Sequence, residues 1–299
     1  MEAFFQWSID LIATLQQIHP ALQVVFRGIT FLGQPHFYVL LLPVLLWCVD
    51  VGLGARLGVF LLLSSHLNAA LKSLFRQPRP CDFDPSLQLA WFEGYGLPSG
   101  HAQFVVLVWG TIAVWVRKRL FWGVAIVLMV LIGLSRIYLG VHFPTDVLAG
   151  WMVGALSLAV YLVVQPRLEA WLVDLRMGQQ LFLALTVPTV LFITHPTKSN
   201  AMAMGTLAGA GAGLPLLYRY VSFSASGPWW QRILRLLAGG AILVLVYVGF
   251  EMVLPGEESS LYLVSQFLLF GLVGLWTTLG APWLFRGLRL APEPPSPAV

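Results

Sequence analysis

The chain has 299 residues, of which 58% are hydrophobic and only 10% are charged, and its mean hydropathy is +0.81. Soluble domains carry a charge on about a quarter of their residues, so this composition excludes an ordinary soluble protein and indicates an integral membrane protein. The net charge of +4 reflects membrane topology more than a nucleic-acid partner, and we expect no nucleic acid to bind.

The first 20 residues predict an amphipathic helix that lies on the membrane surface. Phe5, Ile9 and Ile12 fall near helical spacing, with Asp10 and Gln16 between the apolar positions. This stretch has no basic region at its start and no small-residue cleavage site, so we do not interpret it as a signal peptide.

Nine further stretches are apolar enough to cross a bilayer, which takes roughly 20 mainly apolar residues per helix. The sequence therefore predicts an all-α polytopic bundle of about nine transmembrane helices. The predicted spans are 36–50, 53–75, 99–116, 120–138, 143–164, 179–194, 201–218, 233–254 and 261–284.

Basic residues divide unequally between the loops on the two sides of the membrane. Because successive spans alternate in direction, the positive-inside rule assigns the richer side to the cytoplasm. That side holds 11 of the 17 Lys and Arg residues, namely Arg56, Arg117, Lys118, Arg119, Arg167, Arg176, Arg219, Arg232, Arg235, Arg286 and Arg289. The N-terminus, and the three polar segments described next, then face the extracytoplasmic side.

The first polar segment, KSLFRQPRP, follows the second span. It places Lys72, Arg76 and Arg79 within eight residues. One basic residue at a helix end could simply reach toward lipid headgroups, but three of them on the disfavoured side indicate an anion-binding role.

The second segment, PSGH, opens the third span. The first turn of a helix leaves backbone N–H groups without intrahelical partners at the positive end of the helix dipole, which favours an anion. The alternative is a plain helix cap, in which Ser99 caps the backbone and His101 has no role.

The third segment, SRIYLGVHFPTD, joins the fourth and fifth spans. Pro144 suits a first helical turn, which puts His142 at the cap and Asp146 one turn inside, within reach of the imidazole. A carboxylate that accepts one imidazole N–H fixes the tautomer and leaves the other nitrogen as a nucleophile or base. The alternative is a structural His–Asp pair beside an arginine, Arg136, that reaches toward the headgroups.

Among the groups that these segments supply are two histidines, a carboxylate, a lysine, two arginines and an anion-binding helix start. This set fits phosphoryl transfer, in which catalysis is mainly positioning and electrostatic stabilisation of charged oxygens. We therefore expect no cofactor and no metal. A zinc site is the chemical rival, but zinc-binding histidines are not normally crowded by cationic side chains.

All three segments resemble, in order and internal spacing, the three-part signature of the type 2 phosphatidic acid phosphatase and vanadium haloperoxidase superfamily. The hydrophobic composition favours the membrane-bound lipid phosphatases of that superfamily over its soluble haloperoxidases. The resemblance covers about residues 50–165. It is carried by Lys72, Arg79, Pro80, Pro98, Ser99, Gly100, His101, Ser135, Arg136, His142 and Asp146.

The resemblance implies a role for each residue. His142 is the expected nucleophile that forms a phosphohistidine, Asp146 orients it, and His101 is the expected general acid for the leaving group. The expected phosphate-binding residues are Lys72, Arg79, Ser99, Gly100 and Arg136, with the backbone N–H groups of Gly100 and His101.

The expected substrate is a lipid phosphate or pyrophosphate, such as phosphatidate, phosphatidylglycerophosphate or a polyprenyl pyrophosphate, taken from among the membrane lipids. A sugar-phosphate phosphatase is the alternative, because nine spans and the run SRIYLGVHFP also resemble the glucose-6-phosphatase group, although that group lacks a carboxylate at the place of Asp146. A non-catalytic lipid-binding or transport protein on the same scaffold is the third possibility. The aromatic residues Trp91, Phe92 and Tyr95 either line a lipid entry or lie in the interfacial belt, which we favour.

Four regions follow from these observations. Residues 1–20 form the interfacial helix, 21–165 the phosphatase core, and 166–285 the additional transmembrane helices. Residues 286–299 end in APEPPSPAV, whose proline content predicts a disordered cytoplasmic tail. We expect the protein in the inner (cytoplasmic) membrane, with its active site on the extracytoplasmic face.

Overall fold

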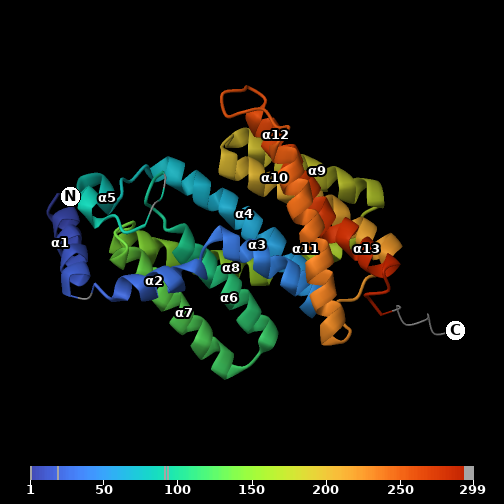
Figure 1. The fold of residues 1–299 in the computed structure, drawn as a ribbon, viewed down its shortest axis with the longest axis horizontal. Coiled ribbons are helices and arrows are strands. Elements are labelled where there is room, and N and C mark those ends of the chain that lie inside the picture. The colour runs from blue at the N-terminus through green and yellow to red at the C-terminus, as the bar shows by residue number, and fades with distance from the viewer. Residues whose placement is uncertain (1, 19, 91, 93, 293–299) are drawn as a thin grey trace. The chain divides into compact units, whose positions relative to one another are not determined.

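The computed structural model describes residues 2–18, 20–90, 92 and 94–292 (Figure 1). This part of the chain consists of helices and loops and contains no β-strand, which confirms the all-α class. The α-helices are α1 (Glu2–Ile18), α2 (Leu22–Phe31), α3 (Pro35–Val44), α4 (Val51–Phe75), α5 (Pro80–Phe83), α6 (Gly100–Val116), α7 (Arg119–Tyr138), α8 (Pro144–Asp174), α9 (Met177–Thr194), α10 (Lys198–Leu216), α11 (Trp229–Glu251), α12 (Tyr262–Leu275) and α13 (Ala281–Gly287). Short 3-10 or π-helical segments are η1 (Leu45–Val49), η2 (Pro85–Leu87), η3 (Leu217–Val221) and η4 (Trp276–Gly280).

Seven helices in the described part of the chain are long and apolar enough to cross a membrane, and an eighth span results if α2 and the α3–η1 segment, which are bent by 46°, count as one. Helix α6 is apolar but has only 17 residues. The multi-pass membrane character is therefore confirmed, whereas the predicted count of nine is not, although every predicted span falls on a helix.

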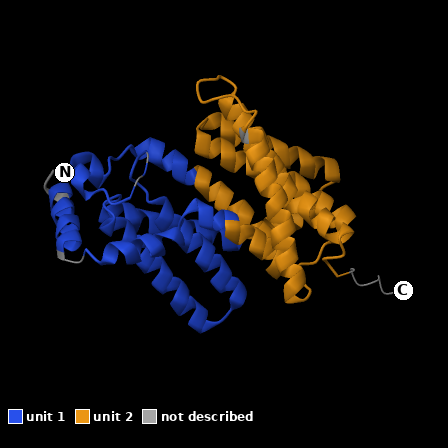
Figure 2. Ribbon diagram, in the orientation of Figure 1, with its two compact units in different colours: residues 1–39, 67–165 blue, residues 40–66, 166–299 orange. Residues whose placement is uncertain are grey.

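The chain forms two compact units (Figure 2). Unit 1 comprises residues 1–39 and 67–165, and unit 2 comprises residues 40–66 and 166–299. Residues 40–66, which belong to the predicted phosphatase core of residues 21–165, pack with the C-terminal helices in unit 2, and the predicted division into functional regions stays a prediction.

Unit 2 holds residues 40–66 through aromatic packing and one buried arginine. Trp47 meets Phe285 edge-on, with ring centroids 5.3 Å apart. The fully buried Arg235 donates hydrogen bonds of 2.8 Å to the carbonyl oxygens of Trp47, Ala225 and Leu290. Because a buried guanidinium is costly unless its N–H groups are satisfied, these bonds tie the end of η1 to the C-terminal helices.

Unit 1 brings the start of α8 close to the start of α6. A Cβ atom on Gly150 would lie 2.5 Å from the carbonyl oxygen of Ser99, so only a glycine allows this approach. The backbone N–H of Ser99 donates a hydrogen bond of 2.9 Å to the carbonyl oxygen of Asp146. Two of the three sequence motifs thereby meet through their main chains.

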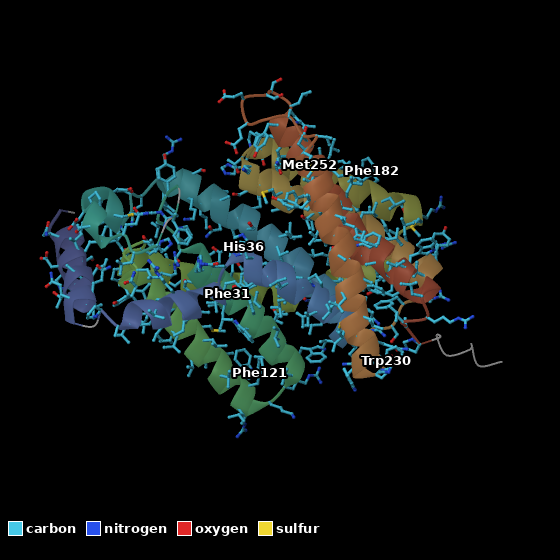
Figure 3. All side chains as sticks on the ribbon, in the orientation of Figure 1. Phe31, His36, Phe121, Phe182, Trp230 and Met252 are labelled. Atoms are coloured by element: carbon cyan, nitrogen blue, oxygen red, sulfur yellow. The ribbon has the colours of Figure 1, made fainter. Side chains whose placement is uncertain are left out.

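Exposed apolar side chains cover the helices of both units. Figure 3 shows labelled examples, among them Phe31, which is 42% exposed, in unit 1, and Phe182 and Met252, which are 65% and 79% exposed, in unit 2. So many exposed apolar side chains are unfavourable in water, whereas contact with lipid tails accommodates them.

Helices lie near both ends of the described chain. The predicted interfacial stretch forms helix α1. In the predicted disordered tail, α13 continues to Gly287 and Leu290 is buried in the core of unit 2, while positions 293–299 lie outside the described residues.

Candidate active site

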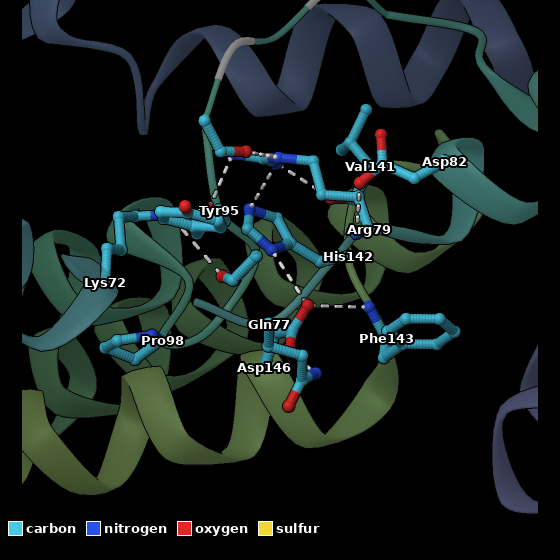
Figure 4. Close-up of polar contacts among 12 residues, drawn as sticks. Lys72, Gln77, Arg79, Asp82, Tyr95, Pro98, Val141, His142, Phe143 and Asp146 are labelled. Atoms are coloured by element: carbon cyan, nitrogen blue, oxygen red, sulfur yellow. Dashed lines mark hydrogen bonds and ion pairs between the residues drawn. The ribbon is translucent and has the colours of Figure 1, made fainter. Parts of the chain in front are cut away.

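All eight predicted site residues lie in unit 1, at or near the ends of α4 and α7 and the starts of α5, α6 and α8. Figure 4 shows Lys72, Arg79, His142 and Asp146 with their polar contacts. These residues lie between positions 72 and 146 of the chain, and His142 contacts both Arg79 and Asp146.

His142 and Asp146 form the expected pair. Nδ1 of His142 lies 3.2 Å from Oδ2 of Asp146, and both side chains are buried. The same carboxylate oxygen accepts a hydrogen bond of 3.0 Å from the backbone N–H of Phe143, just before α8 begins at Pro144. Asp146 therefore caps its own helix while it holds the imidazole.

Arg79 specifies the tautomer of His142 independently of Asp146. Its Nη1 lies 3.3 Å from Nε2 of His142, and because a guanidinium can only donate, Nε2 is the acceptor. The proton then resides on Nδ1, where it is donated to Asp146. Nε2 therefore carries the lone pair, which accepts the hydrogen bond from Arg79; its role as a nucleophile stays a prediction.

Carbonyl oxygens hold Lys72 and Arg79, two of the three basic residues of the first motif. Arg79 donates to the carbonyl oxygens of Gly94 at 2.6 Å and Val141 at 2.8 Å. Lys72 and Arg79 both donate to the carbonyl oxygen of Tyr95. Carbonyl oxygens accept these hydrogen bonds without adding a negative charge, so both cations can also attract an anion.

At the start of α6, Ser99 occupies the helix-cap position but its hydroxyl makes no capping hydrogen bond. Its Oγ atom, and Nε2 of His101, are buried and have no hydrogen-bond partner among the described residues. The plain-cap alternative therefore does not account for Ser99. Buried polar atoms without partners are costly and few in native proteins, which makes this end of α6 a candidate ligand site.

Arg136, at the end of α7, is fully buried. Its Nη1 donates a hydrogen bond of 2.7 Å to the hydroxyl of Thr30, whereas Nε and Nη2 have no partner in the part of the chain that the structure describes. The alternative in which Arg136 reaches toward the headgroups does not hold, because the side chain is fully buried.

Phe92 connects three of these groups. Its ring lies 4.2 Å from Cζ of Arg136 and 5.7 Å from Cζ of Arg79, measured to the ring centroid. It also meets the ring of His101 edge-on at 5.5 Å. We expected an interfacial role for the aromatic residues of this loop, and Phe92 instead borders the site; Tyr95 is 42% exposed, and Trp91 lies outside the described residues.

Charge and burial act together on His142. Burial, and then the nearby cations Arg79, Lys72 and Arg136, lower the pKa of this imidazole well below its ordinary range. At neutral pH the imidazole is therefore uncharged, which is the form that can attack phosphorus.

Two positioning contacts escaped the sequence analysis. Gln77 donates a hydrogen bond of 2.7 Å from Nε2 to Oδ1 of Asp146. In the sequence, only its position inside the first motif indicates that it could lie near the site. Thr30 gave no signal, because it is a single hydroxyl in an apolar stretch more than one hundred positions from Arg136.

No group of three or more His, Cys, Asp or Glu side chains close enough to hold a metal ion occurs among the described residues. Near His142 lie the cations Arg79, Lys72 and Arg136 and one carboxylate, that of Asp146.

Comparison with known proteins gives two family matches. Residues 53–169 match the family described as PAP2 superfamily, and residues 201–293 match the PAP2 superfamily phosphatase transmembrane extension. Phosphatidylglycerophosphatase B of Bacillus subtilis (strain 168) is 36% identical over 156 residues, which cover 46% of this chain and 72% of the relative.

A second relative, sphingosine-1-phosphate phosphatase 2 of Mus musculus, is 30% identical over 208 residues, or 64% of this chain. The chain covers 57% of that relative's own length. Among solved structures, that of the first transmembrane PAP2-type phosphatidylglycerolphosphate phosphatase from Bacillus subtilis is similar, with 28% identity, a TM-score of 0.49, and coverage of 56% of this chain and 88% of the other.

Proposed function

Because the chain belongs to the PAP2 superfamily, we propose that it is a membrane phosphatase that hydrolyses the terminal phosphate of a lipid phosphate or pyrophosphate through a phosphohistidine. The observation that carries this proposal is the pairing of an oriented imidazole with buried donors that have no partner among the described residues. Those donors belong to Ser99, His101 and Arg136. An anion with several oxygens would satisfy all of them at once.

The first step transfers the phosphoryl group to the protein. Nε2 of His142 attacks phosphorus, and the bond from phosphorus to the leaving oxygen breaks. His101, protonated beside the bound anion, gives its Nε2 proton to that oxygen, so the lipid leaves as a neutral alcohol or, from a pyrophosphate, as the shorter phosphate. Asp146 stabilises the positive charge that His142 acquires.

The second step releases phosphate. Water attacks phosphorus, the bond from phosphorus to Nε2 of His142 breaks, and the now neutral His101 accepts the proton of the water. This returns both histidines to their starting states. Lys72, Arg79, Arg136 and the backbone N–H groups at the start of α6 bind the charged oxygens in both steps.

Two features support a lipid as the leaving group. The site lies at the ends of apolar helices. The two relatives described above are named for phosphatases of lipid phosphates, a phosphatidylglycerophosphate and a sphingosine 1-phosphate. The carboxylate of Asp146 also favours the lipid phosphatases over the glucose-6-phosphatase group.

We further propose that the site faces the extracytoplasmic side of the inner (cytoplasmic) membrane. The support is the distribution of basic residues, since 11 of the 17 lie in the opposite set of loops. A cysteine introduced at Ser86, which is exposed in the same loop region, should react with a membrane-impermeant maleimide in intact cells. Labelling only after the membrane is opened would reverse the assignment.

The activity is tested by phosphate release from the purified full-length protein in detergent. Phosphatidate, phosphatidylglycerophosphate, sphingosine 1-phosphate, a polyprenyl pyrophosphate and glucose 6-phosphate are compared. We expect turnover of at least one lipid substrate, and an acid-labile phosphoprotein in quenched samples that His142→Ala lacks. Turnover of glucose 6-phosphate without any lipid turnover would favour the sugar-phosphate alternative, and full phosphate release by a folded His142→Ala variant would exclude this nucleophile.

A further inference from the structure

The guanidinium of Arg136 is held by groups that lie outside the three sequence motifs. Nη1 donates to the hydroxyl of Thr30 in α2 at 2.7 Å. The ring of Phe92 covers one face of the guanidinium, 4.2 Å from Cζ to the ring centroid. One contact fixes an edge of the planar group and the other fixes a face, so together they restrict its orientation.

The remaining edge of the guanidinium carries Nε and Nη2. Both atoms are buried and have no hydrogen-bond partner among the described residues. In a guanidinium these two N–H groups lie side by side and point in the same direction, which is the fork that binds two oxygens of one phosphate. The bond from Nη1 to Thr30 therefore leaves this fork for the substrate.

Helix α2 borders the active site at a second point. A Cβ atom built on Gly33, just beyond the end of α2, would lie 3.0 Å from Cδ2 of His101. Thr30 itself is 3% exposed. The end of α2 thus lies beside both the phosphate-binding arginine and the expected general acid, although it precedes the 53–169 stretch that matches the family.

We propose that Thr30 is a positioning residue, which orients Arg136 so that Nε and Nη2 face the phosphate. This inference rests on the proposed phosphatase function. Without the hydroxyl, Nη1 would lose its acceptor, and the guanidinium could satisfy that buried N–H only by turning, at the expense of the fork.

The test compares Thr30→Val, which keeps the shape and removes the hydroxyl, with Thr30→Ser, which keeps the hydroxyl. Because hydrogen bonds to charged groups are the strong ones, we expect Thr30→Val to lower kcat/KM and to raise the vanadate inhibition constant by about tenfold or more. Thr30→Ser should stay within about threefold of the wild type. Thr111→Val is the matched control, since Thr111 is 6% exposed within α6 and its hydroxyl has no partner in the described chain.

Coupling to Arg136 separates positioning from a general effect on folding. On an Arg136→Lys background, which has no fork, Thr30→Val should have no further effect on kcat/KM or on vanadate binding. An equal loss on both backgrounds, or full activity of Thr30→Val, would overturn the proposal. If Thr30→Val does not fold, Thr30→Ala against Thr30→Ser gives the same comparison. Failure of the phosphatase function itself would be visible in the wild type, which would then release no phosphate.

Discussion

Replacing Asp146 by asparagine removes one negative charge from the site with little change in shape. In the protein, Oδ2 accepts hydrogen bonds from Nδ1 of His142 at 3.2 Å and from the N–H of Phe143 at 3.0 Å. Oδ1 accepts from Gln77 at 2.7 Å. An asparagine with its oxygen at the Oδ2 position preserves the first two bonds, and Gln77 can present its own oxygen to the new NH2 group. We therefore expect Asp146→Asn to fold.

The expected loss arises from charge. His142 becomes positively charged when it carries the phosphoryl group, and the carboxylate lies next to it. Two unit charges about 4 Å apart interact by about 4 kcal/mol at an effective dielectric constant of about 20. This corresponds to a fall in kcat of about 10³-fold. KM should change less, because the phosphate-binding cations remain.

The assay is single-turnover phosphate release by purified protein, with quenched samples analysed for phosphohistidine. Asp84→Asn is the matched control, since Asp84 accepts hydrogen bonds from Ser86 in the same unit and touches none of the site residues; it should stay within about twofold. If folded Asp146→Asn turns over within tenfold of the wild type, the carboxylate does not stabilise the phosphorylated imidazole, and our reasoning is wrong.

Three further predictions follow from the site and its supporting turn. The proposed nucleophile is the neutral form of His142, and burial and nearby cations lower the pKa of this imidazole. We therefore expect kcat/KM to stay constant as the pH falls through about 6.5, the ordinary histidine pKa, and to decline only at lower pH. An NMR titration that gives His142 a pKa at or above that value would contradict this expectation. Vanadate should inhibit competitively, because it adopts the five-coordinate geometry of the transferring phosphoryl group. Metal chelators should have little effect on turnover. A strict requirement for a divalent cation would favour metal catalysis instead. Gly140→Ala should lower the free energy of unfolding by about 1–3 kcal/mol, because Gly140 has φ +70° and an added Cβ would lie 2.0 Å from the carbonyl oxygen of Leu87. Gly123→Ala is the control, since nothing lies within 4 Å of its added Cβ. Equal unfolding midpoints for the two variants would contradict this prediction.

The same site explains why a polar turn is retained between two apolar helices. Arg136 closes α7, and His142 and Asp146 precede and open α8. Between them, Gly140 adopts a left-handed conformation against the backbone of Leu87. The turn thereby places the arginine that we propose to bind phosphate and an oriented histidine within one short connection.

The sequence by itself determined the class of the protein and predicted the chemistry of its site. Hydropathy is a local property, so every predicted span falls on a helix. The pairing of His142 with Asp146 was predictable because both lie within one helical turn, where spacing determines which side chains meet.

Only the tertiary structure decided which residues support that chemistry. The contact of Thr30 with Arg136 joins segments 106 positions apart, and no local pattern marks a hydroxyl whose partner comes from a distant helix. The grouping of residues 40–66 with the C-terminal helices likewise depends on the packing of Trp47 and Arg235. Local periodicity predicts elements and short-range pairs, whereas contacts between distant segments depend on how the helices pack, which a single sequence does not encode in any short pattern.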